Sequence, residues 1–358
     1  MSKVDIIIPA YKPDQKFIEL IRRLEKQSVP VNQIIVMNTE QKYFDRLIYG
    51  TPFLKEYHNI TVKHISKREF DHGRTRNDGV HQSEAEYFVM MTQDAVPADE
   101  HLIKELLKPL QEHKAAVSYA RQLPDTQSGV IERYTRGFNY PEQSQIKTAK
   151  DTERLGVKTF FCSNVCAAYD RGIFDTLGGF CRHTIFNEDM IYAAKAVEAG
   201  YGIAYVAEAK VIHSHNYTNR QQFHRNFDLG VSQADHPEVF AKYPSESEGI
   251  RLVRETIGYL KEQKQQRQIP HLFCQSGFKY AGYWLGKHYQ KLPAKLVLAC
   301  SSSKDYWAQD NRMKASRSID AGRGYGRSEA EQNRSQMGNR SRAGQNQSQT
   351  GNRSQTGK

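Results

Sequence analysis

The first two hundred residues alternate between two patterns of hydrophobic positions. Uninterrupted apolar runs are typical of buried strands, and apolar residues spaced three and four apart are typical of helices with one buried face. We predict strands at residues 4–8, 33–37, 59–65, 87–91, 115–120, 160–169, 203–206 and 210–213. We predict helices at residues 17–24, 73–83, 102–110 and 189–199. Strands that alternate with helices indicate an α/β fold, with a mostly parallel sheet covered on both faces.

The rest of the chain departs from this alternation. Residues 124–153 are polar with a few aromatics, and we expect a long loop or a helical insert with a functional role there. Further helices are predicted at residues 220–229, 247–266 and 276–290. The last fifty residues, rich in Asn, Gln, Gly and Ser, lack apolar side chains to bury. The sequence therefore predicts an α/β domain over 1–217, a helical C-terminal appendage over 218–307 and a disordered, low-complexity basic tail over 308–358.

The charge of the chain is concentrated near its end. The 358 residues carry 51 Lys and Arg against 40 Asp and Glu, a net charge of +11. From residue 301 onward, 11 basic and 5 acidic residues supply +6 of it, so the main body is only mildly basic. A basic tail is weak support for nucleic-acid binding. We expect no specific nucleic-acid partner, with contact between the tail and RNA or another anionic surface as a minor alternative.

The cysteines and the apolar runs bear on the compartment. Five cysteines, with no Cys-x-x-Cys spacing, favour free thiols. No apolar run approaches the ~18 residues of a membrane-spanning helix, and no signal peptide precedes the first predicted strand. We expect a cytoplasmic protein with reduced thiols.

A basic and aromatic stretch near the C-terminus leaves two interpretations open. Residues 278–295 interleave four lysines with large apolar side chains such as Tyr280 and Trp284. One interpretation is a peripheral contact with the inner face of the cell membrane. The other is a helical hairpin that packs on the main domain and keeps its lysines in water.

Candidate chemistry is concentrated at the ends of predicted strands. Asp94 follows the strand at 87–91, Glu188 and Asp189 begin a helix, and His213 and His215 close the last strand. Ligands of open α/β sheets bind at such strand ends. An oxygen and an imidazole nitrogen there could hold a divalent cation, Mg²⁺ or Mn²⁺, and the cation could hold a diphosphate.

Each of these residues also has a plain structural explanation. An Asp before Ala-Val-Pro, such as Asp94, is commonly a turn residue. Glu188 and Asp189 at a helix start could simply complement the helix dipole. His213 and His215 alternate along the chain, so one of them could face the core.

The helix predicted from Gly73 is a candidate phosphate site. Helix N-terminal amides and the guanidinium groups of Arg74 and Arg76 would both favour a diphosphate. The alternative is a surface helix with solvated arginines. No Gly-x-Gly-x-x-Gly follows a predicted strand and no Walker-type Gly-Lys-Ser/Thr occurs, so the dinucleotide fingerprint and the P-loop are absent.

Taken in order, several short motifs resemble those of a family 2 glycosyltransferase with the GT-A fold. They are Ile6-Ile7-Ile8-Pro9-Ala10-Tyr11-Lys12, Arg76-Asn77-x-Gly79, Gln93-Asp94, Leu177-Gly178-Gly179-Phe180 and Asn187-Glu188-Asp189. Finer phrases are similar to the bacterial rhamnosyltransferase branch of that family: Phe70-Asp71-His72-Gly73, Thr92-Gln93-Asp94-Ala95 and His213-Ser214-His215-Asn216-Tyr217. The resemblance extends roughly over residues 4–307.

The resemblance implies roles for the candidate residues. Asp94 matches the metal-binding carboxylate, with His213, or His215 in its place, reaching the same metal. Asp189 matches the base that takes the proton of the acceptor hydroxyl, and Glu188 would hold the acceptor or orient the base. The residues implied to contact the nucleotide or the donor sugar are Pro9, Ala10, Tyr11, Arg76, Gln93, Gly178 and Gly179.

Two positions depart from the family pattern. The usual acid after the second strand is missing, and Asn38 or Glu40 would have to replace it in recognition of the base. Gln93 stands where many members have a carboxylate, so we expect the cation to be held more weakly.

The expected function is that of an inverting transferase. The resemblance implies transfer of L-rhamnose from dTDP-L-rhamnose to a glycan acceptor, a lipid-linked precursor of a bacterial surface polysaccharide. A donor of the UDP-hexose type on the same fold is one alternative. A non-catalytic carbohydrate-binding or scaffold protein is the other.

Overall fold

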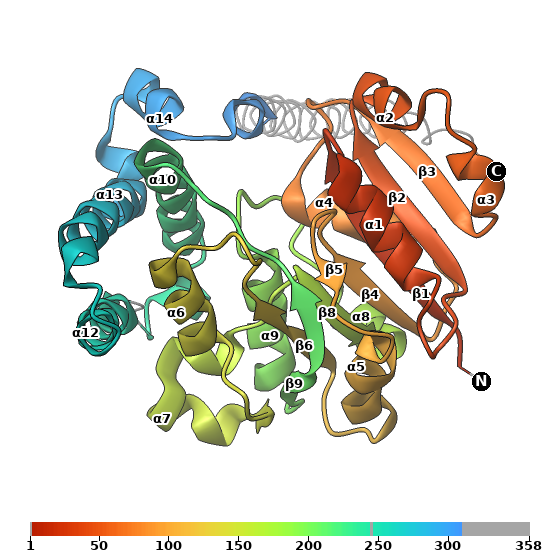
Figure 1. Cartoon of the computed structure of the whole chain (residues 1–358), viewed down its shortest axis with the longest axis horizontal. Coiled ribbons are helices and arrows are strands. Elements are labelled where there is room, and N and C mark those ends of the chain that lie inside the picture. Colours follow the sequence, from red (N-terminus) through yellow and green to blue (C-terminus); the bar gives the residue numbers. More distant parts are fainter. Residues whose placement is uncertain (1, 244–245, 310–358) are drawn as a thin grey trace, which may run out of the picture. The chain divides into compact units, whose positions relative to one another are not determined.

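The computed structural model describes residues 2–243 and 246–309 (Figure 1). Its strands are β1 Val4–Tyr11, β2 Gln33–Thr39, β3 Ile60–Ile65, β4 Tyr87–Met91, β5 Val96–Pro97, β6 Val117–Leu123, β7 Gln145–Lys147, β8 Cys166–Asp170 and β9 Ile203–Ile212. Its α-helices are α1 Gln15–Leu24, α2 Gln41–Ile48, α3 Phe53–Glu56, α4 His72–Val80, α5 Leu102–Gln111, α6 Val130–Asn139, α7 Thr152–Leu155, α8 Arg171–Thr176, α9 Glu188–Glu198, α10 Asn219–Asp235, α11 Pro237–Phe240, α12 Glu246–Glu262, α13 Ile269–Lys287 and α14 Ala294–Cys300. Short 3₁₀ helices are η1 Ala149–Asp151, η2 Gly156–Phe160, η3 Gln266–Gln268 and η4 Tyr289–Lys291.

The strands form one mixed sheet in the order β3-β2-β1-β4-β8-β6-β9-β5, with β7 also paired to β9. The four strands β3, β2, β1 and β4 are parallel, as are β6 and β9. Strand β8 lies antiparallel between β4 and β6. The parallel strands end at the same edge of the sheet, and the candidate residues follow several of those ends.

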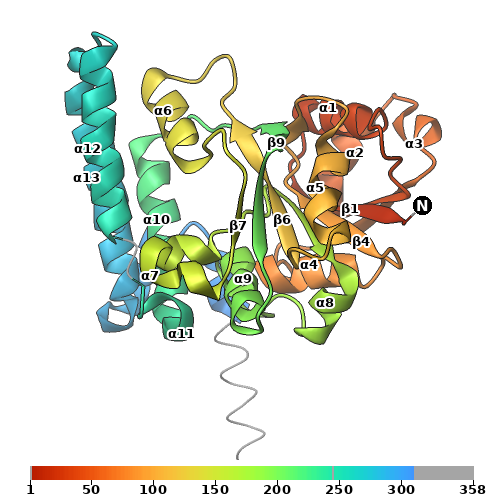
Figure 2. The same ribbon diagram turned by 90° about the horizontal axis from the view of Figure 1, so that it is seen from below.

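Hydrophobic side chains cover both faces of the sheet. Along β1, Ile6 and Ile8 belong to one buried cluster with residues of α1, α2 and α5, while Ile7 belongs to a second cluster with residues of α4, α8 and α9. Successive side chains of a strand point to opposite faces, so a continuous apolar run predicts burial on both. Figure 2 shows these helices on the two sides of the sheet.

The two short strands predicted near residues 203–213 are a single strand with an irregularity. Val206 of β9 pairs with Ala120 of β6, but the next pair joins Lys210 to Arg121, so three residues of β9 are inserted between adjacent positions of β6. The amide of Ala207, within the insertion, donates to Ser144 Oγ at 2.7 Å. The irregularity re-aims the end of β9 beside the end of β6, as β-bulges commonly do.

The strand predicted at residues 160–169 is shorter than expected. Residues 156–160 form η2, and β8 begins only at Cys166. Strand β8 pairs over five residues with β4, while Phe160 and Cys162 are buried among side chains without joining the ladder. The apolar run therefore predicted burial correctly but overestimated the length of the strand. Short apolar runs commonly leave the type of secondary structure ambiguous. The insert at 124–153 contains α6, β7 and η1.

Glycines allow two C-terminal helices to cross closely. A Cβ added at Gly282 of α13 would lie 2.2 Å from the Phe223 carbonyl oxygen of α10, and one at Gly286 would lie 2.1 Å from the Phe227 carbonyl oxygen.

Within the described residues no helix is long and apolar enough to cross a membrane. Residues up to Lys304 form one compact unit. The predicted boundaries stay predictions, and the predicted disordered tail lies outside the described residues from 310 onward.

Candidate active site

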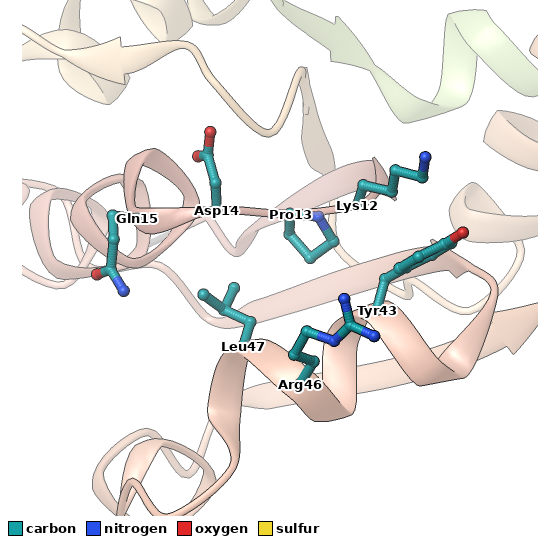
Figure 3. A pocket seen from close by; sticks show the side chains of 7 residues that line it. All are labelled: Lys12, Pro13, Asp14, Gln15, Tyr43, Arg46 and Leu47. Carbon is teal, nitrogen blue, oxygen red and sulfur yellow. The ribbon is translucent and has the colours of Figure 1, made fainter.

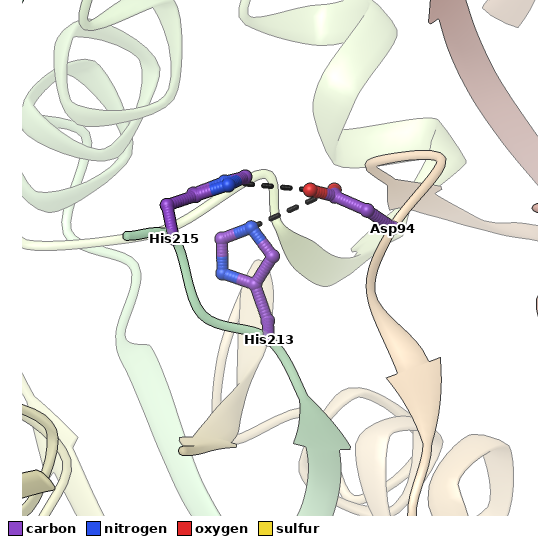
Figure 4. A group of neighbouring side chains, drawn as sticks. All are labelled: Asp94, His213 and His215. Carbon is purple, nitrogen blue, oxygen red and sulfur yellow. Dashed lines mark ion pairs between the residues drawn. The ribbon is translucent and has the colours of Figure 1, made fainter. Parts of the chain in front are cut away.

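One carboxylate and two imidazoles converge beyond the ends of β4 and β9 (Figure 4). Asp94 Oδ1 lies 3.6 Å from His213 Nε2, and Asp94 Oδ2 lies 3.3 Å from His215 Nε2. One ligand atom from each of the three residues lies within 4.8 Å of the others. Both histidines thus face Asp94, and neither is turned into the core. Mixed oxygen and imidazole donors suit a divalent transition metal such as Mn²⁺ better than Mg²⁺, which prefers oxygen ligands.

Burial favours the neutral form of both imidazoles. Burial lowers the pKa of His213 well below its ordinary value, and the neighbouring His215 lowers it further. Burial also lowers the pKa of His215, although the Asp94 carboxylate opposes the shift. A neutral imidazole has the free nitrogen lone pair that a metal needs. The three residues therefore fit the divalent cation that the sequence motifs imply.

Asp189 and Glu188 stand at the first turn of α9, next to the segment that enters β8. Asp189 accepts hydrogen bonds from the backbone amides of Asn164 (2.9 Å) and Met190 (2.8 Å). The side-chain amide of Asn164 donates to Glu188 Oε1 at 3.0 Å. The hydroxyl of Tyr169 in turn donates to Asn164 Oδ1 at 2.6 Å, so Asn164 is fixed from behind. One buried Asn thereby holds both acids in place.

The two acids differ in pKa. Burial raises the pKa of Asp189 to about 7, and the negative charge of Glu188 adds to the shift. Burial also acts to raise the pKa of Glu188, but Arg76, His72 and hydrogen bonds, among them the one from Asn164, together hold that pKa below its ordinary value. Two neighbouring carboxyl groups whose pKa values are shifted in opposite directions are typical of catalytic sites.

Arg76 faces the acidic pair. Its Nε lies 3.1 Å from Glu188 Oε1, and its Nη1 donates to the carbonyl of His72 at 2.9 Å. The first amides of α4, those of Gly73 and Arg74, already donate to Asp71 Oδ1. Arg76 is therefore neither solvated nor unpaired, and a diphosphate at this helix start would have to compete with the cap. Its implied contact with the nucleotide stays a prediction.

Gln93 is engaged by the backbone of the first strand. The Tyr11 amide donates to Gln93 Oε1 at 2.8 Å, and Gln93 Nε2 donates to the Tyr11 carbonyl at 3.0 Å. These two hydrogen bonds between the Gln93 side chain and the Tyr11 backbone fix the end of β1 beside the end of β4. The glutamine thus has a structural task that explains an amide at a position where many family members have a carboxylate.

The residues considered for base recognition also have partners. Asn38 is fully buried, with Nδ2 2.9 Å from His64 Nδ1. Glu40 accepts from the Lys67 amide at 3.0 Å, and its positive φ of 65° places it at the turn before α2. Recognition of the base by either residue stays a prediction.

An open pocket of about 520 Å³ lies between the start of α1 and α2 (Figure 3). It is lined by Lys12, Pro13, Asp14, Gln15, Tyr43, Arg46 and Leu47. The Lys12 ammonium lies 5.3 Å from the ring centre of Tyr11 and 5.1 Å from that of Tyr43. The pocket thus borders Tyr11, but Pro9, Ala10 and Tyr11 are not part of its lining.

Gly178 and Gly179 form a tight turn after α8, with φ of 76° and 69°. Asn77 of α4 holds the turn, because its side chain accepts from the Phe180 amide (3.0 Å) and donates to the Phe180 carbonyl (2.8 Å). A Cβ on Gly179 would lie 2.9 Å from Asn77 Oδ1. The two glycines are therefore required by backbone geometry, and their place beside a donor sugar stays a prediction.

Contacts along the sheet edge connect Asp94, His213 and His215, the cation cluster, with Glu188 and Asp189, the acidic pair. The amide of Thr92, two residues before Asp94, donates to the Val165 carbonyl at 3.1 Å. Val165 follows Asn164, which holds Asp189. The structure therefore brings the residues of both groups to the same edge, as the strand ends predicted.

Four residues near these groups escaped the sequence reasoning. Gln122 and Asn164 are buried polar residues next to His213 and Asp189, and Arg136 bonds to Gln122. The guanidinium of Arg225 lies over the rings of Phe186 (4.6 Å) and Tyr217 (5.6 Å). Residues 163 and 164 are a polar pair inside an apolar run, and this pattern could have identified Asn164 as a candidate. Arg136 and Arg225 lie on amphipathic helices and gave none.

Comparisons with known proteins show the family of the chain. The sequence profile described as Glycosyl transferase family 2 matches residues 5–178. The O-antigen chain rhamnosyltransferase RfbN of Salmonella typhimurium is 37% identical over 307 residues, 85% of this chain and 96% of that protein. The O-antigen chain rhamnosyltransferase WbaN of Salmonella anatum is 37% identical over 310 residues, 86% of this chain and 96% of that protein. Among solved structures, the mannosyltransferase PcManGT from Pyrobaculum calidifontis, in complex with GDP-Man and Mn²⁺, aligns with a TM-score of 0.49 and 14% identity over 85% of this chain and 84% of that chain.

The sheet topology and the matches in sequence define a glycosyltransferase with a mixed, mostly parallel GT-A sheet, as the sequence predicted. The chain belongs to glycosyl transferase family 2. The resemblance to the rhamnosyltransferase branch is confirmed by the two relatives, each aligned over nearly its whole length.

Proposed function

We propose that this enzyme transfers L-rhamnose from dTDP-L-rhamnose, with inversion, to a hydroxyl of a growing, lipid-linked surface polysaccharide. The named activity of the two relatives supports the sugar and the type of acceptor. The observation that carries the chemistry is the pairing of Asp189, whose pKa is raised, with a separate cation cluster at the same sheet edge. Inverting transfer needs a base on the acceptor side and relief of charge on the leaving diphosphate.

Asp189 is the proposed base. Its two oxygens accept one backbone N–H each, and a carboxylate has about four lone-pair positions, so capacity remains for an acceptor hydroxyl. A base with a pKa near the working pH is worth ~10²–10⁴-fold in rate. Glu188 stays ionised and, through Arg76 and Asn164, keeps α9 and its base in register.

The leaving diphosphate would lie on the other side of the site. A divalent cation held by Asp94 and His213, with His215 beside them, would neutralise the charge that develops there. Arg225 is a further candidate for this anion. Its guanidinium rests on two aromatic rings and has no hydrogen bond or ion pair with the described residues, so its N–H donors are free for phosphate oxygens. Its charge also acts on His213 and His215, and on His72, which lies 4.0 Å from Glu188, so Arg225 lies near both groups.

A thermal-shift panel of dTDP and UDP, each with and without Mn²⁺, is the first test. A ligand at 100 times its dissociation constant stabilises by about 2.7 kcal/mol, enough for a clear shift. We expect the largest shift with dTDP plus Mn²⁺, its loss in Asp94→Asn, and rhamnosyl transfer from dTDP-L-rhamnose. A preference for UDP would assign a UDP-sugar donor. No shift with any nucleotide would overturn the proposed dTDP-L-rhamnose donor and its dependence on Mn²⁺.

We also propose that the α13–α14 region contacts an anionic membrane surface. Residues 263–304 contain seven Lys and Arg and no Asp or Glu. Six exposed large hydrophobic residues lie in this stretch: Phe273, Phe278, Tyr280, Trp284, Leu296 and Leu298. Spacings of seven and four place Phe273, Tyr280 and Trp284 on one side of α13, and Gly282 and Gly286 are buried against α10. Interfacial helices bind in this way, by apolar area and basic charge together.

Vesicle flotation tests this contact. We expect the wild type to float with vesicles of anionic lipid and not with zwitterionic ones, and a Phe273→Ala/Tyr280→Ala/Trp284→Ala variant to stay at the bottom. Tyr49→Ala, at a side chain that is 89% exposed elsewhere, is the matched control and should float. Equal flotation of the triple variant would assign the α13 surface to another role.

A further inference from the structure

Gln122 at the end of β6 is a buried amide with every polar atom engaged. Its Oε1 faces His213 Nδ1 at 3.0 Å and also accepts from Arg136 Nη1. Its Nε2 donates to the hydroxyl of Tyr140 and to Ser163 Oγ, the latter at 3.0 Å. Gln122 is only 2% exposed. It touches a candidate metal ligand from the side away from Asp94.

Arg136 decides which way the amide points. A guanidinium has only donors, so the Gln122 atom that faces it must be the oxygen. The same oxygen faces His213 Nδ1, which must therefore carry the proton. A neutral imidazole has one N–H, so its Nε2, directed at Asp94, presents a lone pair. The ion pair of Arg136 with Glu132, at 2.8 Å, holds the guanidinium in turn.

We propose that Gln122, oriented by Arg136, is a positioning residue that locks His213 in the Nδ1–H tautomer and so makes His213 the primary imidazole ligand of the cation. The inference rests on the metal-assisted function proposed above. Metal-binding histidines commonly donate their other N–H to a fixed acceptor, and loss of that acceptor costs 10–100-fold in affinity or activity. His215 has no such acceptor: among the described residues its ring contacts Asp94 and the rings of His213 and Tyr217.

The irregularity of β9 builds this contact. Gln122 pairs with Val211, and the His213 amide donates to the Leu123 carbonyl at 3.0 Å, both only after the three-residue insertion in β9. The same amide side chain reaches Ser163, whose neighbour Asn164 holds the proposed base. Gln122 thus lies between the imidazole of the cation cluster and the segment that positions Asp189.

Binding of Mn²⁺ alone tests the proposal, without donor or acceptor. We expect Gln122→Leu to raise the Mn²⁺ dissociation constant by about 10–100-fold, measured by electron paramagnetic resonance of the free ion. Gln122→Glu keeps an acceptor for the imidazole N–H and should restore most of the affinity. Arg136→Leu frees the amide to rotate and should weaken binding, whereas Arg133→Leu, an exposed arginine one turn earlier on α6, should not.

A second readout needs no metal. Long-range ¹H–¹⁵N spectra of the metal-free protein distinguish the two imidazole tautomers, and we expect His213 in the Nδ1–H form in the wild type and a mixture in Arg136→Leu. An Nε2–H signal in the wild type overturns the proposal, as does an unchanged Mn²⁺ affinity in folded Gln122→Leu. If Gln122→Leu does not fold, Arg136→Leu and Gln122→Glu decide in the same way.

The outcomes separate this proposal from the proposed function. Tautomer and Mn²⁺ effects as expected, with no transfer from dTDP-L-rhamnose, would support the role of Gln122 and overturn the donor. Transfer in a wild type whose Mn²⁺ affinity is indifferent to Gln122 would do the reverse.

Discussion

The cation cluster and the acidic pair stand at one sheet edge but differ in how far the protein completes them. Glu188 has an arginine, an asparagine and a histidine around it, and Asp189 has two backbone donors. Among the described residues, Asp94 has only two imidazoles beside it, and burial disfavours the positively charged form of both. The protein itself therefore supplies the partners of the acidic pair, whereas the cation cluster gains its strongest interaction only when it binds a cation.

This contrast predicts different responses to mutation. In the acidic pair, removal of a partner should lower the stability of the protein or shift the pKa of Asp189. In the cluster, removal of a residue should chiefly damage ligand binding. Substitutions in the acidic pair are therefore the sharper probes of how the fold and the chemistry depend on each other.

Asp189→Asn should have the largest effect on activity. It removes the proposed base but keeps the shape of the side chain, so we expect kcat to fall by ~10²–10⁴-fold while the fold and the nucleotide-induced thermal shift persist. Initial-rate assays with saturating donor measure this. The control is Asp175→Asn, at an exposed acid on α8 that pairs with Arg171. Full activity in Asp189→Asn would remove Asp189 from the mechanism.

Arg76→Leu should have the largest effect on stability. The Arg76 and Glu188 side chains are only 8% and 6% exposed, and an unpaired buried charge typically costs 3–5 kcal/mol. Urea unfolding should show a loss of about that size, with partial recovery in Arg76→Leu/Glu188→Leu. Arg22→Leu breaks a pair whose side chains are 54% and 35% exposed, and should cost about 1 kcal/mol or less. A small loss in Arg76→Leu would mean that the pair is hydrated or that Arg76 serves a ligand instead.

These two residues also show what the sequence could and could not predict. The positions of most strands along the chain followed from hydrophobic spacing. The strand-end positions of Asp94 and the histidines and the helix start at Glu188 followed from spacing and motif order. The pairing of Arg76 with Glu188 did not, because it joins positions 112 residues apart on two different helices. Nothing in local pattern distinguishes a buried arginine at a helix start from a solvated one.

The same limit applies to Gln122 and Asn164. Gln122 acquires its contact with His213 only through the register shift between β6 and β9, which the sequence showed merely as two short apolar runs. Asn164 lies in a run predicted to be a strand, where the structure has the approach to β8. Side chains that position others are fixed by tertiary register, so periodicity alone could not identify them.

The pH dependence should be about tenfold per unit on the acidic side. Burial and the charge of Glu188 raise the pKa of Asp189 to about 7, and only the ionised form can accept a proton. We therefore expect kcat/KM to rise with pH through about 7 and then to level off. Glu188→Gln removes the neighbouring negative charge and should move this limb to lower pH. A limb that stays in place in Glu188→Gln would assign it to a different group.

The smallest expected effects concern the glycine turn, where two adjacent substitutions can be compared. Gly178 and Gly179 both have positive φ, so alanine at either costs roughly 1–2 kcal/mol of backbone strain. A Cβ at Gly179 would also press on Asn77 and Phe174, whereas one at Gly178 would meet nothing within 4 Å. Gly179→Ala should therefore be the less stable of the two in thermal unfolding. Gly178→Ala points its methyl group into open space, so it should raise the donor KM only if a donor sugar occupies that space. An unchanged donor KM in Gly178→Ala would show that the turn serves the packing of α4 and α8. The donor would then bind at the strand ends without contacting the turn.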